Sequence, residues 1–420
     1  MEIISTLSQR REFLKKGILA GLGLGLMPSL SLANDSVPQP GWNDLKGQFN
    51  IPKDYHYFNT GTLGISPKYV IEKYKSAIDV VNSKGIYGQH KKALIAALSD
   101  LVSCDIEEIA LTHNVTEGIN IAAWAVPLKK DDEIILCTHE HAGNIIPWLN
   151  RAEKDKLKIK LIELGANGTE TLVNLANAVT ANTKVIALPH IPCTIGHVLP
   201  VKQICKLASS IGAYSCIDGA HGAGMLELDM HDIGCDFYSS CFHKWMLGPK
   251  GSGFLFVRKA LLPMVETHYA GAYSDQNWSL ENAQVQYSGI RTDSAARYAY
   301  GTQSDAIHAG SLASIEFMRA LGMKKVANHI RKIGKYLCEG LLEIPEIELL
   351  VSSNSKETAG IISFKPKNKD YKELTKVLNH DSFRIRMVPE SGINCIRIST
   401  HLYNSKEDID LLLSAIKKHV

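Results

Sequence analysis

The sequence has 420 residues, of which 45% are hydrophobic and 21% charged, and its formal net charge is +3. This composition excludes a disordered or fibrous chain, and the length indicates one large domain and one smaller domain. Because no block of lysine or arginine stands out beyond the first twenty residues, nucleic acid is not expected as a partner.

The first 33 residues have the pattern of a secretory signal. Arg10-Arg11 precede an apolar run at Ile18–Met27, and Ser31-Leu32-Ala33 supplies small residues suited to a signal peptidase. The arginine pair predicts the twin-arginine route, with the translocation machinery as a transient partner and the periplasm as the destination. The apolar run is too short for a comfortable membrane anchor. A mature chain that begins at Met1 would instead indicate a cytoplasmic protein.

The nine cysteines are an odd number, and several lie in apolar runs, as Cys137 and Cys216 do. Such residues are expected to be small core hydrophobes with free thiols rather than partners in disulfides. A chain that folds in the reducing cytoplasm and crosses the membrane already folded can keep free thiols. No CxxC pair or histidine-rich tract predicts a metal site.

Residues 34–59 are rich in proline and polar residues and are expected to form an N-terminal arm. From 60 to 303, short apolar runs alternate with amphipathic stretches, which predicts a large domain with a mostly parallel α/β sheet. Its predicted strands lie at residues 108–112, 133–137, 159–162, 185–188, 214–217 and 253–257. Its predicted helices include residues 93–102, 173–179 and 201–210.

The C-terminal third begins with an irregular region. Residues 272–306 are polar and are expected to form an ordered functional loop. A long helix is predicted from Ser304 to Ile344, where Pro345 would end it. A small α+β C-terminal domain, residues 304–420, is completed by two short strands and a final helix, at 360–364, 395–399 and 405–419.

Two residues carry the first chemical signal. Asp218 ends an apolar strand, and because ligands bind at the carboxyl ends of parallel strands, this carboxylate is expected to face a cleft. Alone, it would more simply cap the next helix. Lys244 follows between His243 and a glycine-rich turn, a setting poorly explained by a solvated surface charge. A lysine amine can form a Schiff base and a carboxylate can keep a pyridine nitrogen protonated, which predicts pyridoxal phosphate (PLP) as cofactor.

Taken in order, Asp218-Gly-Ala-His221, His243-Lys-Trp245 and Gly248-Pro-Lys-Gly-Ser-Gly253 resemble the class V aminotransferase group of fold-type I PLP-dependent enzymes, and most closely its isopenicillin N epimerase-like branch. The resemblance runs from Tyr57-Phe-Asn-Thr-Gly-Thr-Leu-Gly64 to Arg397, and the shared order of the motifs makes it specific. It implies a PLP-dependent enzyme with epimerase or aminotransferase chemistry at the α-carbon of a small-molecule amino-acid substrate.

The same resemblance implies the roles of the central residues. Lys244 would hold PLP as an internal aldimine and later move the α-proton of the substrate, while Asp218 would pair with the pyridine nitrogen. His221 would hydrogen-bond the ring oxygen, and His141 would stack on the ring. Arg397 would bind the substrate α-carboxylate through two parallel hydrogen bonds.

The phosphate is expected at a helix N-terminus. Thr116 and Glu117 lie where a strand turns into a helix, so free N–H groups there would bind phosphate, although Thr116 would cap the helix even without a ligand. The resemblance places His243 and Ser240 on the phosphate side. Thr302 matches a residue that reaches the phosphate of the neighbouring subunit, which implies a homodimer with shared active sites.

Three departures from the family pattern bear on the reaction. Cys193-Thr194 stands where relatives place Asn or Ser near the ring oxygen, so either side chain could make that contact. Gln303 stands where epimerase-like sequences often carry Arg, which puts the same substrate in doubt. The stretch Arg384–Asn394 lacks the loop cysteine that cysteine desulfurases use as a nucleophile, and Cys395 is expected in the core. Desulfurase activity is therefore not favoured.

The outcome after loss of the α-proton stays open between epimerisation, transamination and β-elimination. Epimerisation needs a second acid or base opposite Lys244, which His, Tyr or Cys side chains in residues 55–65 or 268–300 could supply. A PLP-dependent C–S lyase of the same fold is the main alternative function. A non-catalytic PLP-binding protein is less favoured because Lys244, Asp218 and Arg397 are all present. The side chain of the substrate is not indicated.

Overall fold

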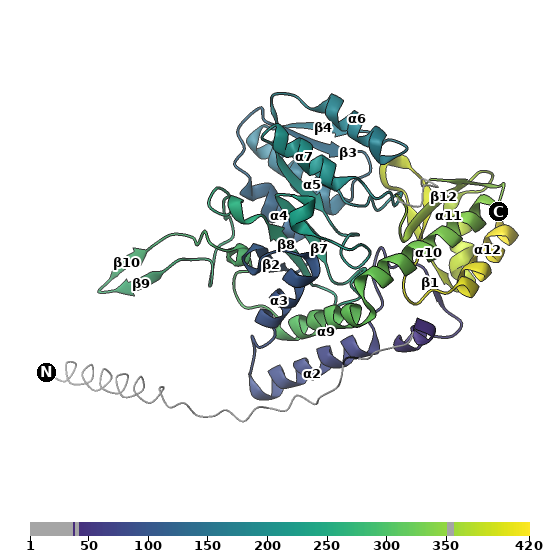
Figure 1. Ribbon diagram of the computed structural model, residues 1–420, viewed down its shortest axis with the longest axis horizontal. Helices are drawn as coiled ribbons and strands as arrows, with labels where there is room; N and C mark the ends of the chain where they lie inside the picture. Colours follow the sequence, from purple (N-terminus) through teal and green to yellow (C-terminus); the bar gives the residue numbers. More distant parts are fainter. Residues whose placement is uncertain (1–36, 38–41, 351–356) are drawn as a thin grey trace. The chain divides into compact units, whose positions relative to one another are not determined.

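The computed structural model describes Val37 and residues 42–350 and 357–420 (Figure 1). The predicted signal at residues 1–33, with its arginine pair, lies outside the described residues. None of the helices in the described part is long and apolar enough to cross a membrane. Pro38–Val420 is one compact unit, and its two main hydrophobic cores surround a large sheet and a small sheet.

The large sheet has seven described strands in the order β2-β8-β7-β6-β5-β3-β4. They span β2 Ile109–Thr112, β3 Glu133–Cys137, β4 Lys158–Ile162, β5 Thr183–Pro189, β6 Tyr214–Asp218, β7 Phe237–Cys241 and β8 Gly253–Val257. The pairs from β4 to β7 are parallel, which confirms the predicted fold class. Strand β8 is antiparallel to β7 and β2. The connection at residues 242–252 is too short for a parallel crossover, so β8 must reverse.

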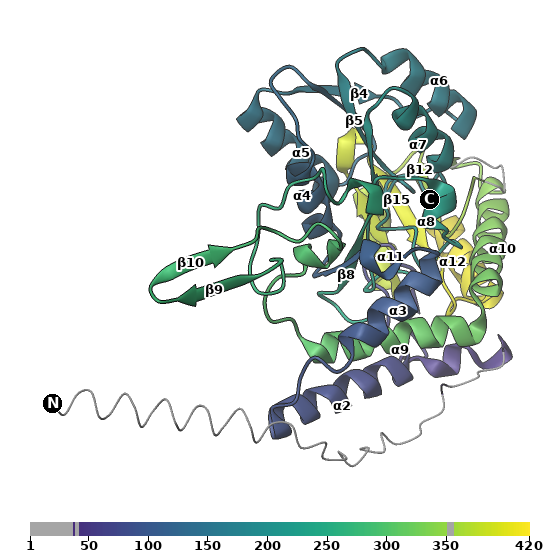
Figure 2. The same cartoon turned by 60° about the vertical axis from the view of Figure 1, so that its left-hand side comes forward.

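Helices cover this sheet, and the predicted helices at 93–102, 173–179 and 201–210 are confirmed. They span α2 Lys68–Lys84, α3 Lys91–Val102, α4 Val115–Ala125, α5 Ala142–Asp155, α6 Gly168–Ala178, α7 Val201–Ser210, α8 Met230–Ile233 and α9 Asp305–Leu321. Helices α2 and α3 both pack on α9, and Figures 1 and 2 show α2 beside α9. Ala77, Ala306 and Ala309 form the contact, because their short side chains let the helices approach closely.

The prediction of one continuous helix from 304 to 344 is wrong at Gly322. The chain ends α9 there and begins α10, Met323–Leu342, with Gly322 at φ 82°. Glycine adopts this left-handed backbone at little cost, but helical periodicity does not reveal a break of one residue. Leu337 of α10 belongs to the core of the small domain, whereas α9 packs on α2 and α3. The change of core therefore lies between α9 and α10, later than the predicted boundary between residues 303 and 304.

The small sheet is antiparallel, in the order β11-β12-β15-β14. This domain contains β11 Ile347–Leu349, β12 Ile361–Pro366, β14 Arg386–Val388, β15 Cys395–Ser399, α11 Tyr371–His380 and α12 Lys406–His419. Phe58 of the N-terminal arm is fully buried in its core. Strand β1 (His56–Tyr57) pairs in parallel with β13 (Phe383–Arg384). The arm is therefore part of the C-terminal domain in space, although it is first in sequence.

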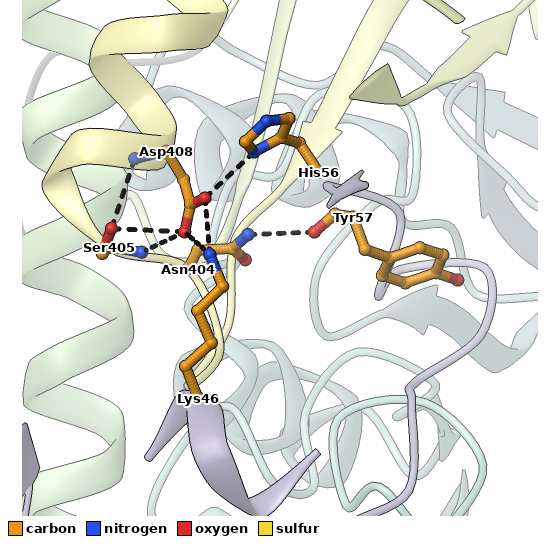
Figure 3. Close-up of polar contacts among 6 residues, drawn as sticks. All are labelled: Lys46, His56, Tyr57, Asn404, Ser405 and Asp408. Atoms are coloured by element: carbon orange, nitrogen blue, oxygen red, sulfur yellow. Dashed lines mark hydrogen bonds and ion pairs between the residues drawn. The ribbon is translucent and has the colours of Figure 1, made fainter. Parts of the chain in front are cut away.

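Lys46 and His56 fasten the arm to Asp408 near the start of α12 (Figure 3). Lys46 Nζ lies 2.8 Å from Asp408 Oδ1, and His56 Nδ1 lies 3.0 Å from the same oxygen. The N-cap residue Ser405 donates its N–H to Asp408 Oδ2 at 3.0 Å. Burial opposes the charge of Asp408, but hydrogen bonds from these three partners lower its pKa below the ordinary value. Lys46, His56 and Asp408 are called the arm clamp below.

The region predicted as an irregular ordered loop, residues 272–306, contains a hairpin. Its strands are β9 (Trp278–Glu281) and β10 (Gln284–Tyr287), and Figure 1 shows the hairpin projecting from the large domain. The strands are short and polar residues interrupt their apolar ones, so the sequence pattern did not separate them from a loop. A short 3-10 helix, Ala295–Tyr298, returns the chain to the large domain.

Candidate active site

A cavity of about 250 Å³ lies where β6, the β7–β8 connection and β15 meet, and it contains most of the predicted site residues. Its wall is formed by Gly61, Thr62, Asn114, Val115, Thr116, His141, Gly143, Cys193, Asp218, Ala220, His221, His243, Lys244, Arg386 and Arg397. The large domain, the segment that directly follows the arm and the small sheet all contribute. The predicted residues of this wall lie far apart along the chain, and the fold brings them together.

Lys244 lies in the connection between β7 and β8 and is partly exposed. The next residue, Trp245, is fully buried and donates its indole N–H to His221 Nδ1 at 2.9 Å. The ring of His401 stacks on Trp245 at 5.5 Å between centroids, and His401 Nε2 lies 2.9 Å from the Trp245 carbonyl oxygen. The main chain of Lys244 is therefore fixed by its neighbour, while its amine reaches the cavity.

Asp218 ends β6 and is buried, with Oδ1 accepting the N–H of Ala220 at 2.8 Å. Burial raises the pKa of Asp218, and the positive charge of Lys244 opposes this rise. A cation placed beside the carboxylate would further favour its ionised form. The site therefore has a buried acid suited to a protonated ring nitrogen.

Two histidines line the same cavity as neutral rings. His141 is the N-cap of α5, and its Nδ1 accepts the N–H of Gly143 at 3.0 Å. Burial, followed by the charge of Lys244, lowers the pKa of His141. Burial, followed by the charge of Lys244, holds the pKa of His221 well below its usual value. Because Nδ1 of His221 accepts from Trp245, its neutral ring carries the proton on Nε2, which leaves a donor.

The N-termini of α4 and α5 converge on the cavity. Asn114, not Thr116, caps α4: its Oδ1 accepts the N–H of Glu117 at 2.9 Å. Gly143 lies so close that a Cβ there would stand 2.6 Å from Thr116 Oγ1. His243 also lines this region, and burial lowers its pKa to about 4. Two helix N-termini at one point favour an anion, as the phosphate prediction requires.

Three predicted residues are not brought into the cavity wall. The carboxylate of Glu117 pairs with His113 Nδ1 at 2.8 Å, outside the cavity. The hydroxyl of Ser240 donates to the carbonyl of Gly219 at 2.7 Å and is fully buried in β7, so it is not free for phosphate. Thr302 is exposed and stays a prediction, because its role requires a second subunit.

Arg397, on β15, is buried and is held by the arm. One of its Nη atoms donates to the carbonyl of Cys193 at 3.1 Å. The other donates to Asn59 Oδ1 at 3.2 Å and Thr62 Oγ1 at 2.8 Å. Burial, with Arg386 second, lowers the pKa of Arg397 to about 10, so it remains charged at neutral pH. Its partners are all neutral, which leaves the positive charge available to a carboxylate.

Cys193 and Thr194 differ in their surroundings. Cys193 lines the cavity, whereas Thr194 is fully buried with Oγ1 2.9 Å from His139 Nδ1. Burial raises the pKa of the Cys193 thiol. Cys395 is fully buried on β15, as the sequence predicted. All nine cysteines are free, which also agrees with the sequence.

One residue of the wall, Arg386, was missed from the sequence, and Gln303 was expected in it but lies elsewhere. Arg386 on β14 lies opposite Arg397 on β15 in the register of the sheet, and both residues line the cavity. The two arginines of Arg384-Ile-Arg386 could have indicated this residue, but the strand register that places Arg386 cannot be read from the sequence. Gln303 lies elsewhere: its amide donates to the Leu111 carbonyl at 3.2 Å and lines a separate small cavity. The residue expected to distinguish the substrate is therefore outside this site.

A model of the aminotransferase class-V family matches residues 89–412. A probable cysteine desulfurase of Pyrococcus abyssi is 25% identical over 401 residues, which cover 90% of this chain and 97% of that protein. A probable cysteine desulfurase of Borreliella burgdorferi is 28% identical over 387 residues, 86% of this chain and 91% of that protein.

Solved structures show the same fold. The apo cysteine desulfurase from Thermococcus onnurineus NA1 has a TM-score of 0.80 at 25% identity, covering 90% of this chain and 97% of that one. The cystine C–S lyase C-DES, in complex with its product cysteine persulfide, has a TM-score of 0.79 at 24% identity, covering 87% and 98%. The fold-type I class is confirmed. These relatives carry the names of desulfurases and a lyase, so the predicted epimerase-like branch is not supported.

PLP fits the residues present. The cavity offers an amine on Lys244, a buried acid on Asp218 and a ring face on His141. The converging N-termini of α4 and α5 suit its phosphate. Lys244 would hold the aldehyde carbon, Asp218 the ring nitrogen and the segment Asn114–Thr116 the phosphate.

Proposed function

The chain belongs to the aminotransferase class-V family, whose enzymes depend on PLP, and from this premise we propose that it is a C–S lyase acting on a cysteine-type amino acid. The observation that carries the proposal is the combination of a complete amino-acid site with a loop, residues 389–394, that contains no cysteine. The names of the relatives support cleavage at sulfur. The missing loop thiol favours release of sulfur rather than its capture by the protein.

PLP, when bound, withdraws electrons from the α-carbon of the substrate. Arg397 would bind the α-carboxylate with its Nη atoms and so orient the Cα–H bond. Lys244 Nζ would take the Cα proton. Asp218 would hold the proton of the ring nitrogen, and His221 would donate its Nε2–H to the ring oxygen. Because Asp218, His221 and Arg397 are buried, less water competes for these hydrogen bonds.

The overall reaction consumes a cysteine derivative and water and yields pyruvate, ammonia and a thiol. The Cα–H bond breaks as Lys244 accepts the proton, and the Cβ–S bond breaks with its electron pair on sulfur. The sulfur then takes a proton and leaves as a thiol. No oxidant or reductant is required, and no protein thiol takes part.

Epimerisation is less well supported because the two stretches expected to supply its second acid or base bring none into the described part of the wall. Only Gly61 and Thr62 of residues 55–65, and none of residues 268–300, belong to the described part of the wall. Neither can exchange a proton with an α-carbon at neutral pH. Tyr57, the nearest candidate in sequence, donates its hydroxyl to the Leu63 carbonyl at 2.6 Å instead.

Product analysis tests the proposal. Purified protein with PLP is incubated with L-cysteine, L-cystine and S-methyl-L-cysteine, and pyruvate, alanine and D-amino acid are measured. We expect pyruvate with an equivalent amount of thiol, and none from Lys244→Ala. Alanine with protein-bound sulfur would show a desulfurase, and D-amino acid without pyruvate would show an epimerase.

We also propose that the enzyme is exported by the twin-arginine route, on the basis of Arg10-Arg11 and the apolar run that follows. The mature protein from a periplasmic fraction is expected to begin near Asn34. An N-terminus at Met1 would overturn export without affecting the proposed chemistry.

A further inference from the structure

Arg386 and Glu390 form an ion pair beside the cavity. Arg386 lines the wall next to Arg397 and donates one Nη–H to Glu390 Oε1. The other Nη atom of Arg386 and Oε2 of Glu390 are buried, and neither has a hydrogen-bond partner among the described residues. One Nη atom of Arg386 and one carboxylate oxygen of Glu390 are therefore left without a hydrogen bond.

The loop that carries Glu390 connects the two domains. Ser391 donates its hydroxyl to the Thr138 carbonyl of the large domain at 2.6 Å. Ser391 and Asn394 hold left-handed backbones, at φ 53° and 54°, which gives the loop a tight path from β14 to β15. Glu390 is thus fixed at the junction of the domains, beside an arginine that faces the substrate.

The charges of the pair act on the site in opposite directions. Arg386 lowers the pKa of Cys193, His141 and Arg397, whereas Glu390 raises each of them. Glu390 therefore cancels part of the positive charge that Arg386 would bring to the cavity. A substrate end with one negative charge alone would have to compete with Glu390 for this arginine.

We propose that Arg386 and Glu390 recognise the distal end of the substrate, and that this end is a second amino-acid zwitterion, as in a disulfide of two cysteines. This proposal rests on the lyase function proposed above. Inserted between the two side chains, a zwitterion replaces one ion pair by two: its carboxylate meets Arg386 and its ammonium meets Glu390. A distal carboxylate alone leaves Glu390 unpaired, and a distal ammonium alone leaves Arg386 unpaired, so both bind less well.

The chemistry balances for such a disulfide. L-Cystine and water yield pyruvate, ammonia and cysteine persulfide. The Cα–H and Cβ–S bonds of one half break, the electron pair leaves on the inner sulfur, and the S–S bond stays intact. Disulfide substrates also persist in the oxidising compartment to which export would deliver the enzyme.

A substrate panel tests the distal end directly in the wild-type holoenzyme. L-Cystine carries both distal charges; the mixed disulfide of L-cysteine with 3-mercaptopropionate carries only the carboxylate, and that with cysteamine only the ammonium. Pyruvate formation gives kcat and KM for each. We expect kcat/KM for L-cystine to exceed that for either mixed disulfide by about tenfold or more, mainly through KM.

The variant Glu390→Gln keeps a hydrogen bond to Arg386 but removes the charge. We expect it to raise KM for L-cystine about tenfold and to leave that for the carboxylate-only disulfide unchanged or lower. Glu339→Gln is the matched control, because Glu339 pairs with Lys335 at the same four-residue spacing on the exposed face of α10.

The outcomes separate the two proposals. Equal kcat/KM for all three disulfides, with no change in Glu390→Gln, would overturn the distal-zwitterion inference and leave the lyase function intact. Failure of every substrate to yield pyruvate would overturn the lyase function and this inference together.

Discussion

Gly64 lies directly against the main chain of Lys244. A Cβ built on Gly64 would stand 2.0 Å from the Lys244 carbonyl oxygen, and the N–H of Gly64 donates to the His243 carbonyl at 2.8 Å. The segment that directly follows the arm therefore packs on the loop that carries Lys244. Because Thr62 of the same segment contacts Arg397, we expect this contact to couple the setting of Arg397 to that of Lys244.

Gly64→Ala is expected to displace that loop, because the close atom is backbone and has no flexible end to yield. Overpacking of this kind costs about 1–3 kcal/mol of stability. We expect a lower midpoint of thermal unfolding and a weaker absorbance band of bound cofactor. Gly271→Ala is the control, since its Cβ would meet Tyr300 at an ordinary 3.6 Å. An unchanged cofactor band in Gly64→Ala would contradict the coupling.

Thr62→Val removes a hydroxyl that accepts from Arg397 while keeping the shape of the side chain. A hydrogen bond to a charged group contributes about 1.5–3 kcal/mol. Without the bond to Thr62, the guanidinium of Arg397 should be less well oriented. We expect KM for the amino-acid substrate to rise roughly tenfold, with kcat reduced less. Steady-state pyruvate assays measure both. A fall in kcat at constant KM would show that Thr62 acts elsewhere in the reaction.

Asp408→Asn tests the arm clamp (Figure 3). The pKa of Asp408 is lowered in the folded chain, so its contribution to stability is present above its ordinary pKa of 3.8 and is lost as the pH falls below that value. We expect Asp408→Asn to destabilise the protein by about 1–3 kcal/mol at pH 7. The difference from wild type should shrink as the pH falls below 3.8.

Urea unfolding at several pH values measures this difference. Asp410→Asn is the control, because Asp410 lies on the same helix as Asp408 but is exposed, with Tyr336 as its hydrogen-bond partner. A loss of stability in Asp408→Asn that does not depend on pH would show that its shape, and not its charge, holds the arm.

Hybrid dimers test the predicted role of Thr302 across subunits. Lys244→Ala and Thr302→Ala chains are refolded separately and as an equal mixture, and activity is measured at limiting PLP. If Thr302 serves the partner's site, the mixture should regain about one quarter of wild-type activity, because half of the dimers are hybrids with one complete site each. No gain over the separate chains would place Thr302 outside the neighbouring site.

The sequence determined most strands of the large sheet and the central chemistry, because both are encoded locally. Apolar runs marked the strands from β2 to β8 except β7, and the order of Asp218, Lys244 and Arg397 indicated the cofactor and the amino-acid substrate. The positions of a strand end, a lysine in a glycine-rich turn and a helix N-terminus follow from neighbouring residues. These features could be predicted without knowing which distant segments touch.

The tertiary structure decided which side chains share the cavity. The register between β14 and β15 places Arg386 beside Arg397, and a shift of one residue would turn Arg386 to the other face. The segment that directly follows the arm brings Thr62 to Arg397 and Gly64 to Lys244. Burial turns Ser240 toward Gly219 and leaves Cys193 facing the site. Such contacts depend on packing between segments far apart in the chain, and no local pattern carries that information.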